Sequence, residues 1–241
     1  MQKQYEKSTT IPAQPNFQLT ITDHPDIINC MKQGTYEMIY DKADGICVYD
    51  QVNQLYYADA LNTQAAETIL QNTMHMTGDL VARGVIMKQV CEQRNLRLSK
   101  PYQFAVFMET VPQKVVQIPY QIHKLTKDAI PYICAHYSYK PLAIPKYIEE
   151  RIEAGMLGAF HGHQLIAFIG THDSGSIGLL EVETKHQRKG IGAVLTLSMI
   201  KEQLKKGLIP YAELFTDNQK SRKMAEKLKL KLSKSLIYWV Y

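Results

Sequence analysis

An apolar strand pattern, a basic turn with two glycines and a helical pattern follow one another between residues 177 and 205. The turn spans residues 187–193 and reads Gln-Arg-Lys-Gly-Ile-Gly-Ala. A strand, a tight glycine turn and a helix start bring backbone N–H groups to one point, which is how many proteins bind a pyrophosphate. The segment therefore predicts a cofactor that carries phosphate groups.

Two common phosphate-binding motifs do not fit this turn. A dinucleotide fingerprint requires a third glycine three residues after the second, and this chain has Leu195 there. The fingerprint also requires an acidic residue about 20 residues further on, and the strand 209–212 of this chain contains no acidic residue. The chain contains no Gly-x-x-x-x-Gly-Lys-Ser/Thr loop. The pattern therefore disfavours both a nicotinamide cofactor and ATP.

The turn resembles that of the GNAT superfamily of coenzyme A-dependent N-acyltransferases, Gln/Arg-x-x-Gly-x-Gly/Ala, through Gln187, Gly190 and Gly192. The order of the flanking segments is similar too, and the resemblance covers residues 118–241. It implies a mixed α/β (α+β) fold with a central, twisted, mixed sheet in which strands four and five splay apart. The segments that carry it are a strand at 180–182, a strand at 211–215, a helix from Asp217-Asn218 to Leu228 and a closing strand at 236–240.

The remaining segments predict a similar order of elements in both halves of the chain. The second half opens with a strand at 120–125, helices at 128–138 and 144–154, and a hairpin formed by 156–161 and 164–171. The first half has strands within 45–58, helices at 63–70 and 79–95, and a strand at 103–109. Residues 77–84 stand where its basic turn is needed but lack a Gly-x-Gly.

We therefore expect two tandem GNAT-like units. A degenerate unit spans residues 1–114, and an acyltransferase domain that binds acyl-CoA spans residues 115–241. The layout resembles the glycine N-acyltransferase branch of the superfamily, in which a non-catalytic N-terminal half precedes the working one. The proline-containing stretch 111–119 is the expected connection.

Composition narrows the class of protein. The 241 residues carry a net charge of +5, no apolar run approaches the ~18 residues of a membrane span, and the polar N-terminus lacks a secretory signal, so we expect a cytoplasmic protein without membrane association. The late lysines are not interleaved with aromatic residues, which argues against nucleic acid. A homodimer is compatible with the sequence.

Cysteine and histidine spacing gives no metal site. The four cysteines form no Cys-x-x-Cys pair, and they are interpreted as reduced thiols. His161 and His163 flank a hairpin glycine, and no further ligand is suitably spaced. We expect no metal.

The resemblance implies where acetyl-CoA, or another acyl-CoA, would bind as cosubstrate. The pantetheine arm would lie along strand four, and the pyrophosphate would rest in the turn. Asn218 and Ser221 would lie near the cofactor, and Asn218 can also cap its helix whatever the function. The implied cofactor-binding residues are Leu180, Glu181, Val182, Gln187, Arg188, Lys189, Gly190, Ile191, Gly192, Ala193, Asn218 and Ser221.

Acyl transfer to an amine needs a base, and Glu181 and Glu183 are the candidates. Strand alternation places both on one face, where each would raise the pKa of the other. The alternative is a polar strand edge that faces water.

The acid is where the chain departs from the family pattern. Many members carry a tyrosine next to the leaving thiolate, at a position that corresponds to Ala225 here. Either Tyr211 or Tyr238 supplies a hydroxyl instead, or the thiolate leaves without a dedicated acid.

Two functions of different classes follow. The first is an acyltransferase that moves an acetyl or other acyl group from coenzyme A to the amine of a small molecule by direct attack. The second is a non-catalytic acyl-CoA-binding protein with an interaction or regulatory role, in which the missing tyrosine marks lost chemistry. Release of free thiol from acetyl-CoA distinguishes them.

Overall fold

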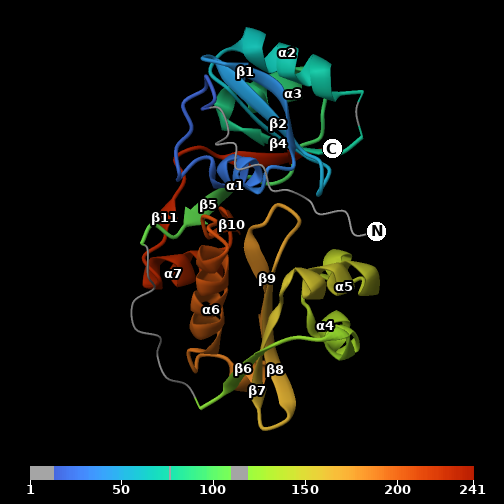
Figure 1. Cartoon of the computed structure of the whole chain (residues 1–241), viewed down its shortest axis with the longest axis vertical. Coiled ribbons are helices and arrows are strands. Elements are labelled where there is room, and N and C mark those ends of the chain that lie inside the picture. The colour runs from blue at the N-terminus through green and yellow to red at the C-terminus, as the bar shows by residue number, and fades with distance from the viewer. Residues whose placement is uncertain (1–13, 76, 110–118) are drawn as a thin grey trace, which may run out of the picture.

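The structure, a computed structural model, describes residues 14–75, 77–109 and 119–241. The chain forms two lobes, and Figure 1 places the first half above the second. The first half contains α1 (Pro25–Gln33), β1 (Tyr36–Lys42), β2 (Gly45–Asp50), β3 (Leu55–Ala60), α2 (Thr63–Thr73), β4 (Asp79–Arg83), α3 (Gly84–Gln93) and β5 (Tyr102–Val106). The second half contains β6 (Gln121–Lys124), α4 (Ile130–His136), α5 (Pro145–Ala154), β7 (Leu157–His161), β8 (Gln164–Thr171), β9 (Ile177–Val182), α6 (Ile191–Lys205), β10 (Tyr211–Phe215), α7 (Gln219–Lys227), β11 (Lys231–Leu232) and β12 (Ile237–Val240).

These strands form two sheets. The larger sheet has the order β1-β2-β3-β4-β12-β5-β10, with β11 also paired to β5, and it contains both parallel and antiparallel neighbours. The smaller sheet has the order β6-β7-β8-β9 and is antiparallel. In the lower lobe α4 and α5 lie on one side of the smaller sheet and α6 on the other (Figure 1). The expected mixed α/β architecture is confirmed.

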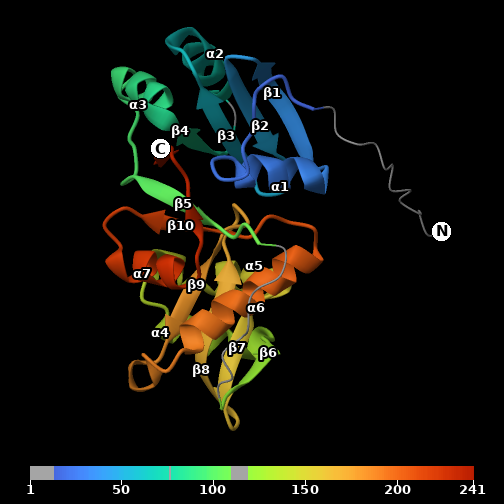
Figure 2. The same cartoon turned by 90° about the vertical axis from the view of Figure 1, so that its left-hand side faces the viewer.

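The two halves exchange strands in the larger sheet. β12, from the end of the chain, pairs with β4 of the first half, where Val240 lies opposite Leu80. β5, from the first half, lies between β12 and β10, where Phe104 faces Glu213. Figure 2 shows β5 and β10 together at the junction of the two lobes. The sheet is therefore continuous across the lobes.

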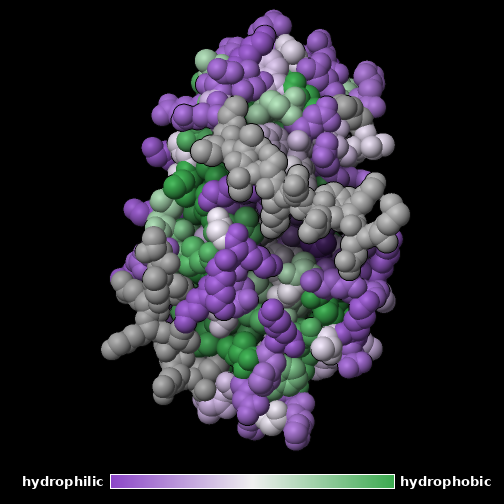
Figure 3. All heavy atoms as spheres, in the orientation of Figure 1, coloured by the Kyte–Doolittle hydropathy of each residue, from purple (hydrophilic) through white to green (hydrophobic). Residues whose placement is uncertain are grey.

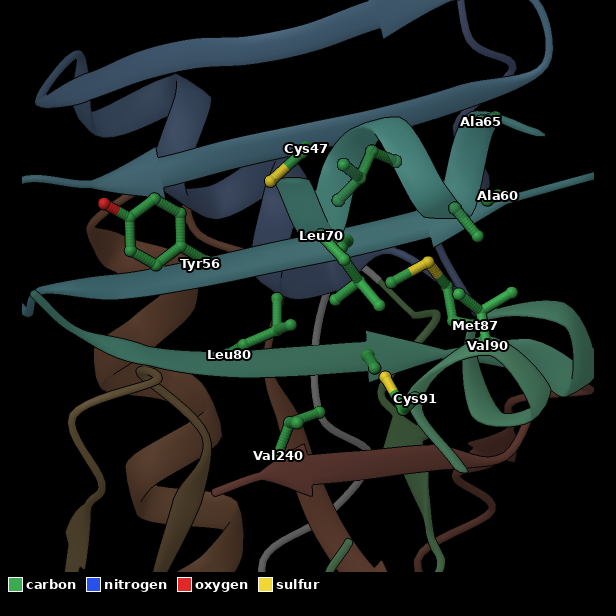
Figure 4. Close-up of a cluster of buried hydrophobic side chains, with 14 of the residues drawn as sticks. Cys47, Tyr56, Ala60, Ala65, Leu70, Leu80, Met87, Val90, Cys91 and Val240 are labelled. Carbon is green, nitrogen blue, oxygen red and sulfur yellow. The ribbon is translucent and has the colours of Figure 1, made fainter. Parts of the chain in front are cut away.

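The core of the first half depends on this exchange. Its buried cluster combines side chains from β2, β3, α2, β4 and α3, among them Cys47, Leu70 and Met87. Val240 of β12 belongs to the same cluster and is 7% exposed. Figure 4 shows Val240 pointing toward Cys91 and Leu80. The end of the chain thus completes the apolar core of the first half.

One predicted helix is wrong in its first part. Residues 79–83 form the strand β4, and helix α3 begins only at Gly84. β4 pairs in parallel with β3 and antiparallel with β12, so Leu80, Val81 and Ala82 are buried on both faces of the sheet. A strand buried on both faces is continuously apolar and gives no alternation to distinguish it from a helix. α1, β1 and β11 were not predicted.

The remaining elements agree with the sequence pattern. The hairpin β7–β8 and the strands β9 and β10 are confirmed. Asn62 caps α2, and its side chain accepts from the Ala65 N–H at 2.8 Å. The predicted domain boundary at 114/115 lies outside the described residues. Residues 77–84 are not the counterpart of the basic turn, because the connection from β3 into α2 is formed by residues 61 and 62.

The two strands that flank α2 in the first half and the two strands that flank α6 in the second half are arranged differently. In the first half β3 and β4 are hydrogen-bonded neighbours over five residue pairs, from Leu55 opposite Asp79 to Asp59 opposite Arg83. In the second half the equivalent strands β9 and β10 belong to different sheets. We call the opening between them the β9/β10 gap. This gap is the splay of strands four and five that the resemblance implied.

Surface polarity differs between the lobes. In the orientation of Figure 1, polar residues cover most of the upper lobe, whereas apolar residues show among the charged ones lower down (Figure 3). Within the described ranges, none of the helices has the length and apolar character that crossing a bilayer requires.

Candidate active site

The turn before α6 has the backbone geometry of an anion-binding loop. Gly190 has φ +84° and stands at the N-cap of α6, where no side chain caps the helix. Arg188 also has positive φ, at +62°. The first N–H groups of a helix have no partner within the helix, and the helix dipole adds partial positive charge at this end. The turn can therefore hold a phosphate group by its backbone.

Gly192 is held close to β9. A Cβ atom at Gly192 would lie 3.6 Å from a Leu180 side-chain carbon, 3.9 Å from one of Val182 and 3.4 Å from one of Met224. Leu180 and Val182 therefore point to the α6 side of the sheet. These are ordinary van der Waals distances, so the helix start packs against the strand and α7 and a Cβ would still fit at this position.

Strand β9 carries a bulge at the level of the gap. Phe168 pairs with Glu181 and Gly170 with Gly178, so β9 has one more residue than β8 over this stretch. Within the bulge Leu179 has φ +50° although it is a buried, bulky residue. Such a conformation is costly for leucine and persists only where the surroundings enforce it. The bulge changes the direction of the backbone around Leu180.

The backbone of Val182 faces away from β8. The Glu183 N–H donates to the Ile166 carbonyl at 2.9 Å, and the groups of an antiparallel strand alternate between its two sides. The Val182 carbonyl accepts instead from the Gln187 side chain at 3.0 Å. The edge of β9 that borders the β9/β10 gap is thus available for an extended ligand, with Gln187 bound at one end of it.

These observations fit coenzyme A. An open strand edge suits the amides of a pantetheine arm, and an uncapped helix start behind two positive-φ residues suits a pyrophosphate. Gly190, Gly192 and the main chain between them would hold the phosphates, and β9 would hold the arm. The exposed side chains of Arg188 and Lys189 add positive charge at the turn.

Glu181 and Glu183 face the other side of the sheet, toward α4. A Glu181 carboxylate oxygen accepts from the Ser138 N–H at 3.0 Å, just beyond the end of α4. Glu183 Oε1 accepts from the Tyr132 hydroxyl at 2.7 Å, and its Oε2 lies 3.1 Å from the Lys185 ammonium. The predicted shared face is therefore present, and the side chain of Glu183 is only 12% exposed.

The pKa of Glu183 shifts in the direction opposite to the one expected. Burial by itself would raise the pKa of this carboxyl, but the Tyr132 hydroxyl and Lys185 outweigh burial and lower that pKa below its ordinary value. Burial and the bond to Glu183 together raise the pKa of the Tyr132 phenol. Glu183 is therefore ionised at neutral pH and accepts a hydrogen bond from a neutral Tyr132.

A cavity of about 420 Å³ opens in front of these carboxylates. Its walls are Tyr132 and His136 of α4, Ile166 and Phe168 of β8, and residues 181–185 and 187. We call it the carboxylate cavity. Its size lies within the range of small-molecule sites, and it adjoins the stretch of β9 that follows the bulge.

Tyr211 lies at the opposite end of the gap. It begins β10, is 1% exposed, and its hydroxyl donates to the carbonyl of Ser174 in the β8–β9 loop. Ser174 also donates to Glu213 at 2.7 Å, so the starts of β9 and β10 are tied together. Burial raises the pKa of Tyr211 well above its ordinary value. Tyr211 does not line the carboxylate cavity.

Tyr238, the alternative hydroxyl, belongs to β12 and lies opposite Ala82 of β4. It is therefore part of the larger sheet within the first half. The structure brings neither tyrosine together with Glu181 and Glu183.

Acidification is expected to destabilise the fold through His172. Burial, with a contribution from Arg151, lowers the pKa of His172 from 6.5 to about 4. The unfolded chain binds more protons than the folded chain between these values, so the free energy of unfolding should fall as pH falls from about 6.5 to about 4. Melting temperatures across this window should decline less steeply for His172→Asn, and identical slopes would contradict this role.

Helix α7 begins as predicted. The Asn218 side chain accepts from the Ser221 N–H at 3.1 Å, which confirms Asn218 as its N-cap. Ala225 is 3% exposed and packs against Ala105 of β5 and Leu214 of β10. The position that corresponds to the family's tyrosine is therefore inside the protein and faces the larger sheet.

Replacing Ala225 with tyrosine is expected to overpack this contact. The added ring has to displace Ala105 or Leu214, at a cost of about 1–3 kcal/mol of folding free energy. Melting temperature and coenzyme A affinity should both fall. An equal substitution at exposed Glu226, Glu226→Tyr, is the control on the same helix. Unchanged stability in Ala225→Tyr would show that the site is roomier than the packing indicates.

Sequence reasoning missed Tyr132, His136 and Glu213. Tyr132 and His136 are one helical turn apart on α4, a spacing equally typical of a surface helix, and nothing in the pattern relates α4 to Glu183. Glu213 interrupts an otherwise apolar strand, which is a signal for a buried polar group.

Across residues 14–75, 77–109 and 119–241, no three His, Cys, Asp or Glu side chains gather as metal ligands.

Comparison with known proteins identifies the fold. A family described as FR47-like protein matches residues 156–240. No curated protein sequence matches the chain.

Three solved structures are similar over most of the chain. A Drosophila protein has a TM-score of 0.63 and 16% identity, over 81% of this chain and 73% of its own. A GCN5-related N-acetyltransferase-like protein from Streptococcus suis has a TM-score of 0.54 and 14% identity, over 89% of this chain and 92% of its own. A GCN5-related N-acetyltransferase from Kribbella flavida has a TM-score of 0.55 and 12% identity, over 92% of this chain and 96% of its own. The chain has the GNAT fold.

Proposed function

We propose that this protein is a GNAT-type acyltransferase that moves an acetyl or other acyl group from coenzyme A to the amine of a small molecule. The observation that carries the proposal is the β9/β10 gap, bordered by the bulged edge of β9 and ending at the uncapped start of α6. The GNAT fold of the chain supports the same conclusion. In the first half the equivalent strands are paired, which leaves no such gap.

The chemistry follows from the positions of the groups around the gap. The amine nitrogen attacks the thioester carbonyl carbon, and the carbonyl oxygen, which becomes negative, accepts a hydrogen bond from a backbone N–H at the bulge of β9. The carbon–sulfur bond then breaks. The attacking nitrogen gives its proton to Glu181 or Glu183, directly or through water. The leaving thiolate takes a proton from solvent, because Tyr211 is bound to Ser174.

The first half is proposed to be a degenerate unit of the same type with a structural role. Its order of elements from β1 to α3 repeats the order from β7 to α7. Asn62 caps α2 at the place where the second half has Gly190. A side-chain cap occupies the helix N–H groups that an anion would need.

A second candidate is an acyl-CoA-binding protein without catalysis. The absence of a phenol at Ala225 and the bond of Tyr211 to Ser174 favour it, because neither position offers a tyrosine hydroxyl to a leaving thiolate.

Release of free thiol separates the two candidates. The purified chain is incubated with acetyl-CoA and a panel of amines, and equilibrium dialysis measures acetyl-CoA binding in parallel. Amine-dependent thiol release supports the acyltransferase. Binding without release with any amine would leave only the second candidate, and absence of binding would remove both.

A further inference from the structure

We propose that the carboxylate cavity selects amines with an apolar, preferably aromatic, body and no carboxylate next to the amine. This inference rests on the proposed function and names its acceptor class. Four features of the cavity carry it: two carboxylates, an aromatic wall, a buried carboxylate oxygen whose near partner is an exposed lysine, and the position beside the bulge of β9.

The carboxylates give the cavity a place for an ammonium group. Oε2 of Glu183 is buried, and among the described residues it is paired with the Lys185 ammonium at 3.1 Å and with His186 Nε2 at 4.0 Å. The Lys185 side chain is 62% exposed and can be displaced into water. Glu181 faces the same cavity from two residues earlier. A substrate ammonium that takes the place of Lys185 would thus find a buried carboxylate acceptor.

The aromatic wall gives the rest of the substrate a surface. Tyr132 and His136 are stacked with ring centroids 4.0 Å apart, and the Phe168 ring meets Tyr132 edge-on at 6.4 Å. Such a wall binds an apolar or aromatic body and adds cation–π attraction for a nearby ammonium.

The position of the cavity relates it to the acyl group. Glu181 and Val182 belong both to its wall and to the edge of β9 just after the bulge. An ammonium between Glu181 and Glu183 would therefore lie beside the strand along which the thioester is expected.

A carboxylate on the carbon that bears the amine would be unfavourable here. It would lie within a few ångströms of the ammonium and so beside Glu181 and Glu183, where like charges repel at low effective dielectric constant. The cavity should therefore discriminate an amino acid from the amine that differs from it only by loss of carbon dioxide.

The test compares matched pairs of acceptors with the full-length protein and acetyl-CoA. The pairs are 2-phenylethylamine with phenylalanine and 3-methylbutylamine with leucine, and thiol release gives kcat/KM for each. Both amines should exceed their amino acids by at least about tenfold. Glu183→Gln should reduce this ratio, whereas Glu150→Gln, the same change at an exposed position of α5, should leave it unchanged.

A variant at His136 tests the contribution of the aromatic wall separately. His136→Ala removes the ring stacked on Tyr132 from an exposed position, so the fold should survive. It should lower kcat/KM for 2-phenylethylamine by about two- to tenfold and affect 3-methylbutylamine less.

The outcomes separate this inference from the proposed function. Thiol release with amino acids as good as or better than with the amines would overturn the inference and leave the acyltransferase intact. A ratio that Glu183→Gln does not change would overturn it too. If no acceptor releases thiol, the acyltransferase fails, and calorimetry of the four compounds on protein with bound coenzyme A still decides which class the cavity binds.

Discussion

Gly190→Glu is expected to abolish coenzyme A binding in a protein that still folds. Gly190 has φ +84° at the uncapped start of α6, so a glutamate there would adopt an unfavourable backbone conformation and place a negative charge where the phosphates are expected. Two like charges about 4 Å apart repel by about 4 kcal/mol at an effective dielectric constant near 20, which corresponds to roughly a thousandfold loss of affinity. Isothermal calorimetry with coenzyme A measures the loss.

Gly162→Glu is the matched control. Gly162 also has positive φ, +60°, and an added Cβ would meet no atom within 4 Å in the β7–β8 hairpin. Both variants carry the same charge and a similar backbone cost, but only one lies at the turn. Calorimetry that shows normal coenzyme A binding by folded Gly190→Glu would remove the turn from the cofactor site.

Glu181→Gln or Glu183→Gln is expected to lower turnover by about 10²–10⁴-fold, the usual contribution of a general base. Coenzyme A affinity should change little, because both side chains face α4 and the cofactor turn lies across β9 on the α6 side. A loss in one variant alone would identify the base. Full turnover in both would exclude these carboxylates from proton transfer.

The dependence of kcat/KM on pH gives a second test of Glu183 as the base. Because Tyr132 and Lys185 lower the pKa of Glu183, this carboxylate stays ionised as pH falls through the neutral range. If Glu183 is the base, its protonation should not limit kcat/KM near pH 7, and the profile should instead follow deprotonation of the amine. Tyr132→Phe removes the hydrogen bond that stabilises the ionised form, so it should raise the lower pH at which protonation of Glu183 makes the acid limb steeper. If this second break does not move, the Tyr132 contact does not set the pKa of Glu183.

The second half could be predicted largely from its sequence because its signals are local. A strand, a glycine turn and a helix occupy 29 consecutive positions in 177–205, and each is specified by its own residues. Asn218 caps α7 through a residue three positions away. The face shared by Glu181 and Glu183 follows from alternation along one strand.

The missed features depend on contacts between distant segments. Residues 79–83 form a strand because β3 and β12 flank them, and β12 begins more than 150 residues later. The lowered pKa of Glu183 depends on Tyr132, 51 residues earlier. The bond between Tyr211 and Ser174 closes across the gap. None of these partners can be inferred from periodicity, which reports only which face of an element is apolar.

The strand exchange has a consequence for synthesis and folding of the chain. Until Ile237–Val240 leave the ribosome, β4 has an unpaired edge and the apolar cluster around Leu80 and Cys91 lacks Val240. An exposed strand edge of this kind favours pairing with other chains. Removal of residues 237–241 should therefore damage the half of the protein that was made first, and the nascent chain should depend on chaperones until β12 has been made.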